Sequence, residues 1–341
     1  MVNKAIIFII SFSNIIFCQR SFAQRNVISK TVTYEEVYDD PYDINRLFVQ
    51  FQPIYGEFFR SNINLGFGLR ADYFLDKKAD FTLQFRKPYG SKFDFSRDNA
   101  KKNSDFENSP KPFFYVDLGG AYHILDKEVD GKSKFVLFSK SFQNADKWES
   151  MTPEYMEAPI KLRRIYSVRT GGTYYQSTLD VNDISKSQNI NIVDSSGNSI
   201  PGELKAFGNI LVSGIYIGGG MTIIKNVALK FDKTYDQVSN DLIFSAYFDL
   251  CYAPGIVIGD LFYKPAPGLS EIRYFSSSIK TSPLGFRLGI DGKFNRNLSW
   301  GYGIETGIRP GIKNQGLFIQ GRISFPIIGS TLSSEVEAFG K

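Results

Sequence analysis

Apolar and polar residues alternate with a period of two over unusually long stretches of this chain. Between Asn62 and Asp76, every second side chain is apolar, and the residues between them, apart from Phe74, are asparagine, glycine, arginine and aspartate. Because successive side chains of a β-strand point to opposite faces, this pattern predicts a strand with one apolar and one polar face. A short polar turn at 76–78 follows and the alternation resumes through Phe85, which predicts a β-hairpin.

The same pattern recurs along the rest of the chain. It returns between Leu284 and Phe325, in three segments separated by predicted turns at 295–297 and 310–315. Further strands are predicted near 44–57, 112–124, 134–140, 160–178, 205–222, 226–234 and 240–254. The sequence therefore predicts an all-β fold of about 12 antiparallel strands, within a range of about 10 to 14, since strand boundaries are the least certain feature of such an analysis.

Three features favour a transmembrane barrel over a soluble β-protein. Soluble strands average about 5–6 residues, whereas several runs here exceed the roughly 9–11 residues with which a tilted strand crosses a bilayer. Aromatic residues on the apolar faces (Tyr73, Trp300, Tyr302 and Phe325) are typical of interfacial girdles. The polar faces combine glycine with charges of both signs, as a narrow lumen would require. We therefore predict a single up-and-down barrel, because only a closed barrel pairs the backbone groups of membrane strands.

The N-terminus has the features of a cleaved export signal. Lys4 precedes an apolar region at 5–17, and Ser21-Phe22-Ala23 forms a small-x-small cleavage site, so we predict a signal peptide at 1–23. Ile16 and Phe17 before Cys18 argue against a lipoprotein signal, which needs a small residue there. The predicted organisation continues with a periplasmic segment at 24–43, an outer-membrane barrel at 44–326 and a C-terminal tail at 327–341.

Charge and cysteine content exclude several other classes. Loss of Lys4 and Arg20 with the signal leaves 38 of the 40 basic residues against 35 acidic ones, too balanced for a nucleic-acid-binding protein. Cys251 is then the only cysteine, so no internal disulfide is expected. The acidic cluster at 35–43 lacks the spacing of a calcium loop and is interpreted as a solvated segment. With one histidine and no cysteine pair, we predict no metal site and no cofactor.

Loop lengths give a partly consistent membrane topology. Outer-membrane barrels have short periplasmic turns and longer outer loops. With the N-terminus inside, the turns predicted near 76–79, 125–133, 235–239 and 295–297 are periplasmic. The long segments 88–111, 141–159 and 255–281 then lie outside. Segment 180–204 violates the rule, being long yet periplasmic, so either it holds an extra strand near 190–193 or the strand count is wrong.

The C-terminal region resembles outer-membrane β-barrel proteins of the small, OmpA-like class. The resemblance rests on the pattern at 298–303, 309–311 and 323–326, without a peptidoglycan-binding domain after the barrel. It implies insertion by the outer-membrane assembly machinery and contact with outer-membrane lipid. Chains of that class typically end on an aromatic residue in the last strand, whereas this one continues past Phe325.

A structural or transport role follows from this architecture: a pore or conduit for a small solute, or an envelope scaffold whose loops bind an envelope protein partner. An enzyme is not expected. Two alternatives stay open, namely a barrel-type lipid hydrolase or acyltransferase using His123, and a soluble periplasmic β-protein that binds a ligand. The residues predicted to line the lumen, from their shared polar face, are Arg70, Asp72, Asp117, His123, Asp249, Arg287, Asp291, Glu305 and Arg322.

Overall fold

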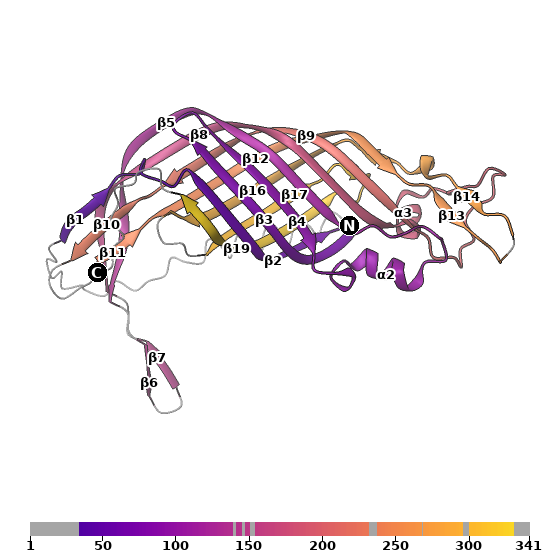
Figure 1. The fold of residues 1–341 in the computed structure, drawn as a ribbon, viewed down its shortest axis with the longest axis horizontal. Coiled ribbons are helices and arrows are strands. Elements are labelled where there is room, and N and C mark those ends of the chain that lie inside the picture. The colour runs from indigo at the N-terminus through magenta and orange to yellow at the C-terminus, as the bar shows by residue number, and fades with distance from the viewer. Residues whose placement is uncertain are drawn as a thin grey trace.

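In the computed structural model of this chain, ten antiparallel strands close into one up-and-down barrel (Figure 1). The structure describes residues 34–138, 141–144, 147–150, 154–231, 237–267, 269–295 and 300–330. The predicted signal peptide at 1–23 and residues 331–341 of the predicted tail lie outside these ranges. The barrel strands are β2 (Leu47–Phe59), β3 (Asn62–Leu75), β4 (Ala79–Pro88), β5 (Phe114–Phe138), β8 (Glu154–Asp180), β9 (Phe207–Ile224), β12 (Leu242–Ile258), β16 (Leu284–Phe294), β17 (Gly301–Ile308) and β19 (Leu317–Ser330).

Each barrel strand pairs with the next along the chain, and β19 closes the barrel by pairing with β2. The all-β, up-and-down prediction is thereby confirmed, with ten strands in place of about twelve. The last pairing runs through Ser330, which faces Leu47, so the barrel extends past the predicted boundary at 326. None of the helices among the described residues is long and apolar enough to cross a membrane.

Two of the predicted strands are not separate barrel strands. The segment 134–140 overlaps the end of β5, which pairs with β8 without interruption through the predicted turn at 125–133. Residues 125–133 are rich in charged side chains because they extend beyond the barrel wall. This polarity resembles that of a turn. The segment 226–234 contains β10 (Val227–Phe231), which pairs with β1 (Tyr34–Asp39) and β11 (Gln237–Asn240) in a separate three-stranded sheet.

With ten strands, the long segment 180–204 no longer lies on the same side as the short turns. We call the end that carries β1, β10 and β11 the sheet end, and the opposite end, with the long connections 89–113, 181–206 and 259–283, the loop end (Figure 1). Because 125–133 is strand, segment 141–159 moves to the sheet end and 180–204 joins the other long loops. Residues 190–193 add no barrel strand; Val193 forms only an isolated bridge with Ser199.

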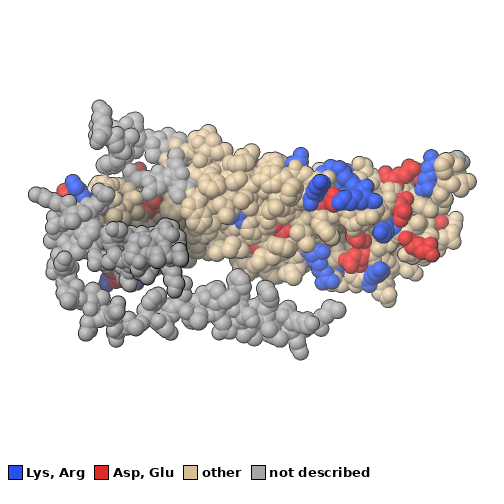
Figure 2. Space-filling model, turned by 90° about the horizontal axis from the view of Figure 1, so that it is seen from below, with Lys and Arg blue, Asp and Glu red and all other residues tan. Residues whose placement is uncertain are grey.

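Apolar side chains remain exposed all around the outer face of the barrel. Leu83, Leu118 and Ile217 are 48%, 60% and 61% exposed, values that a soluble core would not leave. Figure 2 shows a broad band of the surface that carries almost no charged side chains, next to the charge-rich loop end. Exposed aromatic residues lie at both edges of this belt: Tyr73, Phe81, Tyr122 and Trp300 toward the sheet end, and Phe58, Tyr89, Phe95 and Tyr252 toward the loop end.

The long connections at the loop end fold into a compact cap with its own apolar core. Val181 and Ile184 of α3 pack there with Phe59 and Phe318 of the barrel and with Ile192. α3 begins where the Asp180 carboxylate accepts a hydrogen bond from the Asp183 N–H, as N-capping residues do. The elements of this end are η1 (Ser91–Phe93), α2 (Phe95–Asn103), α3 (Val181–Gln188), β13 (Leu261–Tyr263), β14 (Ile272–Tyr274), η2 (Ser276–Ser278), β15 (Thr281–Ser282) and β18 (Gly311–Ile312).

Apolar clusters also occupy the sheet end. Phe48, Phe74, Ile165, Ile224 and Ile243 pack together inside the end of the barrel. Beyond them, the extended β5–β8 hairpin packs on the three-stranded sheet around Phe135 and Phe231. The connection between β5 and β8 contains the small hairpin β6 (Ser141–Asn144) and β7 (Lys147–Ser150). The polar middle of the barrel is thus enclosed between apolar clusters at both ends.

Candidate functional site in the barrel interior

Charged side chains of alternating sign run through the barrel interior in one continuous chain. Near the loop end, Arg309 donates two hydrogen bonds to the Glu57 carboxylate, at 2.9 and 3.0 Å. Glu57 also faces Arg86 at 3.7 Å, and Arg86 lies 3.3 Å from the next carboxylate, Glu305. Glu305 in turn lies 3.7 Å from Arg322. Each charge in this half of the chain therefore has at least one neighbour of opposite sign.

The alternation continues toward the sheet end. Arg322 pairs with Asp291, whose second carboxylate oxygen accepts a hydrogen bond from Arg70 at 3.0 Å. Arg70 also donates to Asp72 at 3.0 Å, and the Lys293 ammonium lies 2.7 Å from Asp72. Nine charges thus alternate from one end of the barrel to the other. A buried charge is costly unless it is paired, and here most of the pairs join strands that are not neighbours in the wall, such as β4 with β17 and β3 with β16.

A shorter chain joins three further strands. The Asp249 carboxylate lies between Arg169 at 3.1 Å and Arg287 at 2.8 Å. Arg287 also pairs with Asp117 on the opposite side of the barrel. Together, the two charged chains contain seven cations and six carboxylates in contact with one another, so the network is close to neutral.

Buried tyrosines fill the space between the ion pairs. Tyr247 donates a hydrogen bond to Glu305 at 2.6 Å, and Tyr216 donates to Asp117 at 3.2 Å. The Arg287 guanidinium also lies 4.1 Å from the centre of the Tyr216 ring, a distance at which a cation is attracted to an aromatic face. Hydrogen bonds and cation–ring contacts therefore tie the tyrosines to the charges.

Glycines on the inward face make room for these rings. A Cβ atom at Gly289 would lie 2.2 Å from the ring of Tyr247. A Cβ atom at Gly119 or Gly171 would lie 1.8 or 2.5 Å from the Tyr216 hydroxyl. At these glycines, which alternate with charged residues in the sequence, the absent side chain thus leaves space for a large side chain from another strand.

The structure places all nine residues of the predicted lumen set on the inward face. Seven of them are buried, and Arg70 and Asp291 are partly buried. Eight belong to the two charged chains, and His123 does not. These eight residues form a packed network, in which every carboxylate contacts an arginine or lysine side chain.

Other members of the network were not singled out from the sequence. Arg86 and Lys293 lie on the same polar faces as predicted residues, so parity alone would have included them. Glu57 is different, because β2 shifts register against both neighbouring strands, between Gln52 and Tyr55 in its pairing with β3 and between Phe51 and Ile54 in its pairing with β19. This bulge changes which residues face inward, and simple alternation through the strand misses it.

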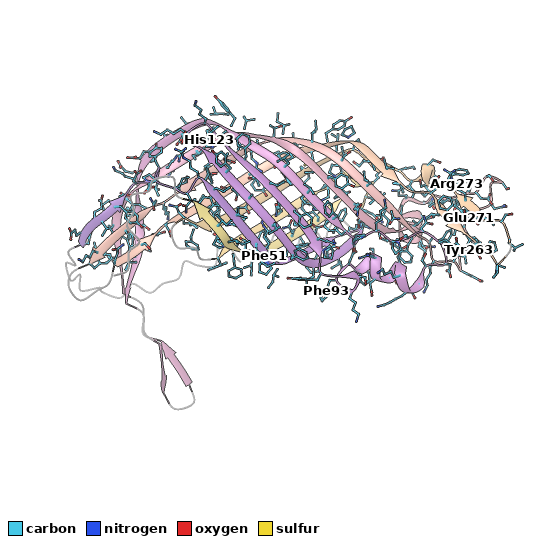
Figure 3. The ribbon with its side chains drawn as sticks, in the orientation of Figure 1. Phe51, Phe93, His123, Tyr263, Glu271 and Arg273 are labelled. Carbon is cyan, nitrogen blue, oxygen red and sulfur yellow. The ribbon has the colours of Figure 1, made fainter. Side chains whose placement is uncertain are left out.

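His123 lies beside Asp80, toward the sheet end of the barrel (Figure 3). Its side chain is fully buried, and its Nε2 atom lies 3.1 Å from the Asp80 carboxylate. Across the β5–β8 ladder it faces Ser167, whose hydroxyl contacts the Gly220 carbonyl at 3.5 Å. Serine, histidine and aspartate are thus neighbours, but they lie on the inner side of the barrel wall, where a bilayer lipid has no access to them.

A small polar cavity lies within the network. Its volume is about 30 Å³, and Arg70, Asp72, Arg169, Asp291 and Lys293 are among its lining residues. That is room for one or two water molecules. Among the residues that the structure describes, no group of three or more His, Cys, Asp or Glu side chains is arranged to hold a metal ion.

Comparisons with known proteins do not identify a family for this chain. No protein-family model matches the chain, and no curated protein matches it. Among solved structures, the chain is similar to one described as "TodX monoaromatic hydrocarbon channel deltaS2 mutant", with a TM-score of 0.22 and 11% sequence identity. The match covers 83% of this chain and 90% of that one. At such a score and identity, the likeness carries no argument about what the present chain does.

Proposed function

We propose that this protein is an integral outer-membrane β-barrel that acts as a sealed scaffold in the envelope, and not as an open pore. The membrane location is supported by the exposed apolar belt between two aromatic edges. It is supported equally by the closed ladder of ten strands, since a closed barrel leaves no unpaired backbone edge in hydrocarbon. A soluble ligand-binding protein would leave that belt in contact with water, at great cost.

The observation that carries the scaffold role is the alternating charge chain across the interior. In a diffusion pore the inward charges would face water and passing solutes. Here they contact one another, and the cavity among them holds about 30 Å³. The apolar core of the cap lies at one end of the chain and the Phe48 cluster at the other. Conduction of a small solute would require this network to separate.

The orientation follows from loop length. We place the loop end outside and the sheet end in the periplasm, in keeping with long outer loops and short inner turns. The folded cap would then present the surface for an envelope protein partner. Insertion by the outer-membrane assembly machinery is part of this proposal, as the resemblance of the sequence to the small OmpA-like class implies. A lipid enzyme using His123 is disfavoured because that side chain is fully buried behind the wall.

Two measurements test this proposal in sequence. Electrophoresis of isolated outer membranes, with and without boiling, should show a mobility change on boiling, as expected of a folded detergent-resistant barrel. Recovery of the protein in the periplasmic extract without such a change would overturn the membrane assignment. Planar-bilayer recordings of the purified protein should then show no steady conductance, whereas a steady open channel in the unaltered protein would establish a pore instead.

Truncation of the network provides the matched positive control. Arg86→Ala/Glu305→Ala removes two adjacent charged side chains from the middle of the chain, and we expect it to create ion leakage. Leu83→Ala/Leu118→Ala removes a comparable side-chain volume from the outward face of two neighbouring strands and should show no ion leakage. Silence of both variants would mean that something other than this network seals the barrel.

A further inference from the structure

A second, larger cavity lies on the outer side of the barrel at the loop end. Its volume is about 930 Å³, within the range of about 300–1,000 Å³ that is typical of small-molecule sites. It lies beside the two-residue turn Arg60-Ser61, which joins β2 and β3 and is shorter than every other connection at that end. α2 borders it on one side and the start of β19 on another. The low turn therefore leaves a notch between taller neighbours, which we call the rim notch.

The apolar half of the rim notch is continuous with the membrane belt. Phe58, Ile63 and Leu317 line it and are 64%, 47% and 62% exposed on the outward face of their strands. Phe95 of α2 lines it as well and is 62% exposed. Since these side chains belong both to the cavity and to the belt, an apolar chain in the surrounding leaflet could enter sideways without crossing water.

The polar half of the notch has one cation that is not neutralised. Two carboxylates also line the notch and keep their negative charge, but both are engaged on the α3 side, where Asp183 accepts a hydrogen bond from Gln315 at 2.9 Å and Asp180 accepts one from the Asp183 N–H. Arg60 is exposed at the notch and has no ion-pair partner among the described residues. Figure 2 shows charged side chains of both signs on the loop-end side of the charge-poor band, with Lys and Arg among those that border it. An anionic group beside Arg60 would therefore supply the ion-pair partner that this cation lacks among the described residues.

The wall formed by α2 is fixed in place by buried hydrogen bonds. Asn62 donates to the Asp94 carboxylate at 2.8 Å and accepts from the Ser96 N–H at 3.0 Å. The Ser96 hydroxyl donates to the Ser61 carbonyl at 2.9 Å, and the second Asp94 oxygen accepts from the Phe113 N–H at 2.7 Å. These contacts tie the start of α2 to the β2–β3 turn, so the notch exists before any ligand arrives and ordering costs are low.

Aromatic contacts hold the preceding segment against the outer face. Phe51 of β2 contacts Phe67, Phe67 contacts Tyr89, and Tyr89 contacts Phe93, with ring centres 6.4, 5.6 and 5.9 Å apart. Figure 3 shows Phe51 and Phe93 along the same edge of the barrel. α2 consequently lies outside the wall at the edge of the belt, where lipid head groups meet acyl chains.

From this arrangement we infer that the rim notch binds an anionic lipid of the surrounding leaflet, with one acyl chain in the apolar half and the phosphate group at Arg60. An acyl chain suits the site because it is flexible, apolar and already present beside the opening. The phosphate is the anionic group that a guanidinium recognises well. The inference rests on the proposed membrane location, which supplies the lipid.

The test uses the full-length protein folded in detergent micelles, with lysophosphatidylglycerol as the anionic single-chain probe and lysophosphatidylcholine of the same chain length as its zwitterionic counterpart. Native mass spectrometry counts the molecules retained. We expect one retained lysophosphatidylglycerol, bound about three times more tightly than the counterpart, as the small energies of exposed charge pairs allow. Equal retention of the two probes would refute the role of Arg60.

Matched variants separate the notch from the belt in general. Ile63→Trp fills the apolar half and should weaken retention by about tenfold or more. Leu83→Trp makes the same change at 48% exposure against 47% for Ile63, away from the notch, and should leave retention unchanged. Arg60→Gln should abolish the preference for the anionic probe, whereas Lys313→Gln, an exposed cation elsewhere at the loop end, should not.

The boiling-dependent mobility change is measured on each sample. A protein that shifts on boiling but retains the probe equally well in the Ile63→Trp and Leu83→Trp forms would overturn the notch inference and leave the barrel proposal standing. A protein that does not shift would overturn the proposed function itself. A variant that loses its shift has not folded, and Arg60→Gln, which alters only an exposed side chain, then decides the matter.

Discussion

Replacement of Arg86 by methionine tests whether the alternating charge chain holds the barrel together. Arg86 has no solvent exposure and lies between Glu57 and Glu305. At 3.3 Å and an effective dielectric constant of about 20, its attraction to Glu305 is about 5 kcal/mol. In the variant, the Glu305 carboxylate still has the Tyr247 hydroxyl at 2.6 Å and Arg322 at 3.7 Å as partners, so it does not lose all of its stabilisation. We therefore expect about 3 kcal/mol of destabilisation, the lower part of the roughly 3–5 kcal/mol range for breaking a buried pair.

The companion variants make this expectation specific. Arg86→Met/Glu305→Gln removes one cation and the adjacent carboxylate charge, and leaves the remaining charges alternating. We expect Glu305→Gln alone to cost about 2–3 kcal/mol and the double variant to cost about as much as Arg86→Met alone, so the coupling energy between the two positions is about 2–3 kcal/mol. Lys87→Met changes the next residue of β4, which is exposed, and should stay within about 0.5 kcal/mol.

The assay is urea unfolding and refolding of the protein in detergent micelles, followed by the fraction that migrates as the folded form without boiling. The free energy of unfolding comes from the midpoint and the slope, which should be the same for all variants if only stability has changed. If Arg86→Met matched Lys87→Met, or if the double variant cost the sum of its parts, the charge chain would not be the source of stability that the contacts indicate.

Two further predictions concern packing and pH. Gly289→Ala places a Cβ atom 2.2 Å from the Tyr247 ring and should cost about 1–3 kcal/mol in the same assay, whereas Gly219→Ala, with its nearest contact at 3.9 Å, should cost little. Burial alone would raise the pKa of Asp260, but hydrogen bonds from Ser276 hold it below its usual range. This contribution to loop stability is present at neutral pH and is lost as the pH falls through the lowered folded-state pKa, so pepsin cleavage within 259–276 should rise as the pH falls below about 4. Asp260→Asn should remove that rise, and a pH-dependent rise in the variant would contradict the assignment.

The local alternation in the sequence predicts much of the barrel wall, because the two faces of a membrane strand meet different media. The runs that begin at Asn62 and Leu284 have inward and outward residues as their parity indicates. Parity carries no information about which sheet a strand joins. The segment 226–234 alternates like a barrel strand, yet β10 packs its apolar residues on the β5–β8 extension.

The charge network is less predictable because its contacts join distant parts of the chain. Arg309 and Glu57 are 252 positions apart, and they meet only because β19 closes on β2. The register shift between Gln52 and Tyr55 also determines that Glu57 points inward. A polar face therefore indicates which residues lie inside, whereas the partner of each charge depends on closure and bulges that no local pattern contains.

The charges inside this barrel have a second consequence, for the orientation of each strand. A slip of one residue in pairing would turn every inward side chain outward, because side chains alternate strictly along a strand. For β16, such a slip would bring Arg287, Asp291 and Lys293 to the apolar outer face and leave their partners unpaired inside. An interior built from apolar residues would impose no such penalty, since both faces would suit hydrocarbon. Buried ion pairs add little net stability compared with apolar packing, so we infer that this chain retains them because they distinguish the inside of the barrel from the outside.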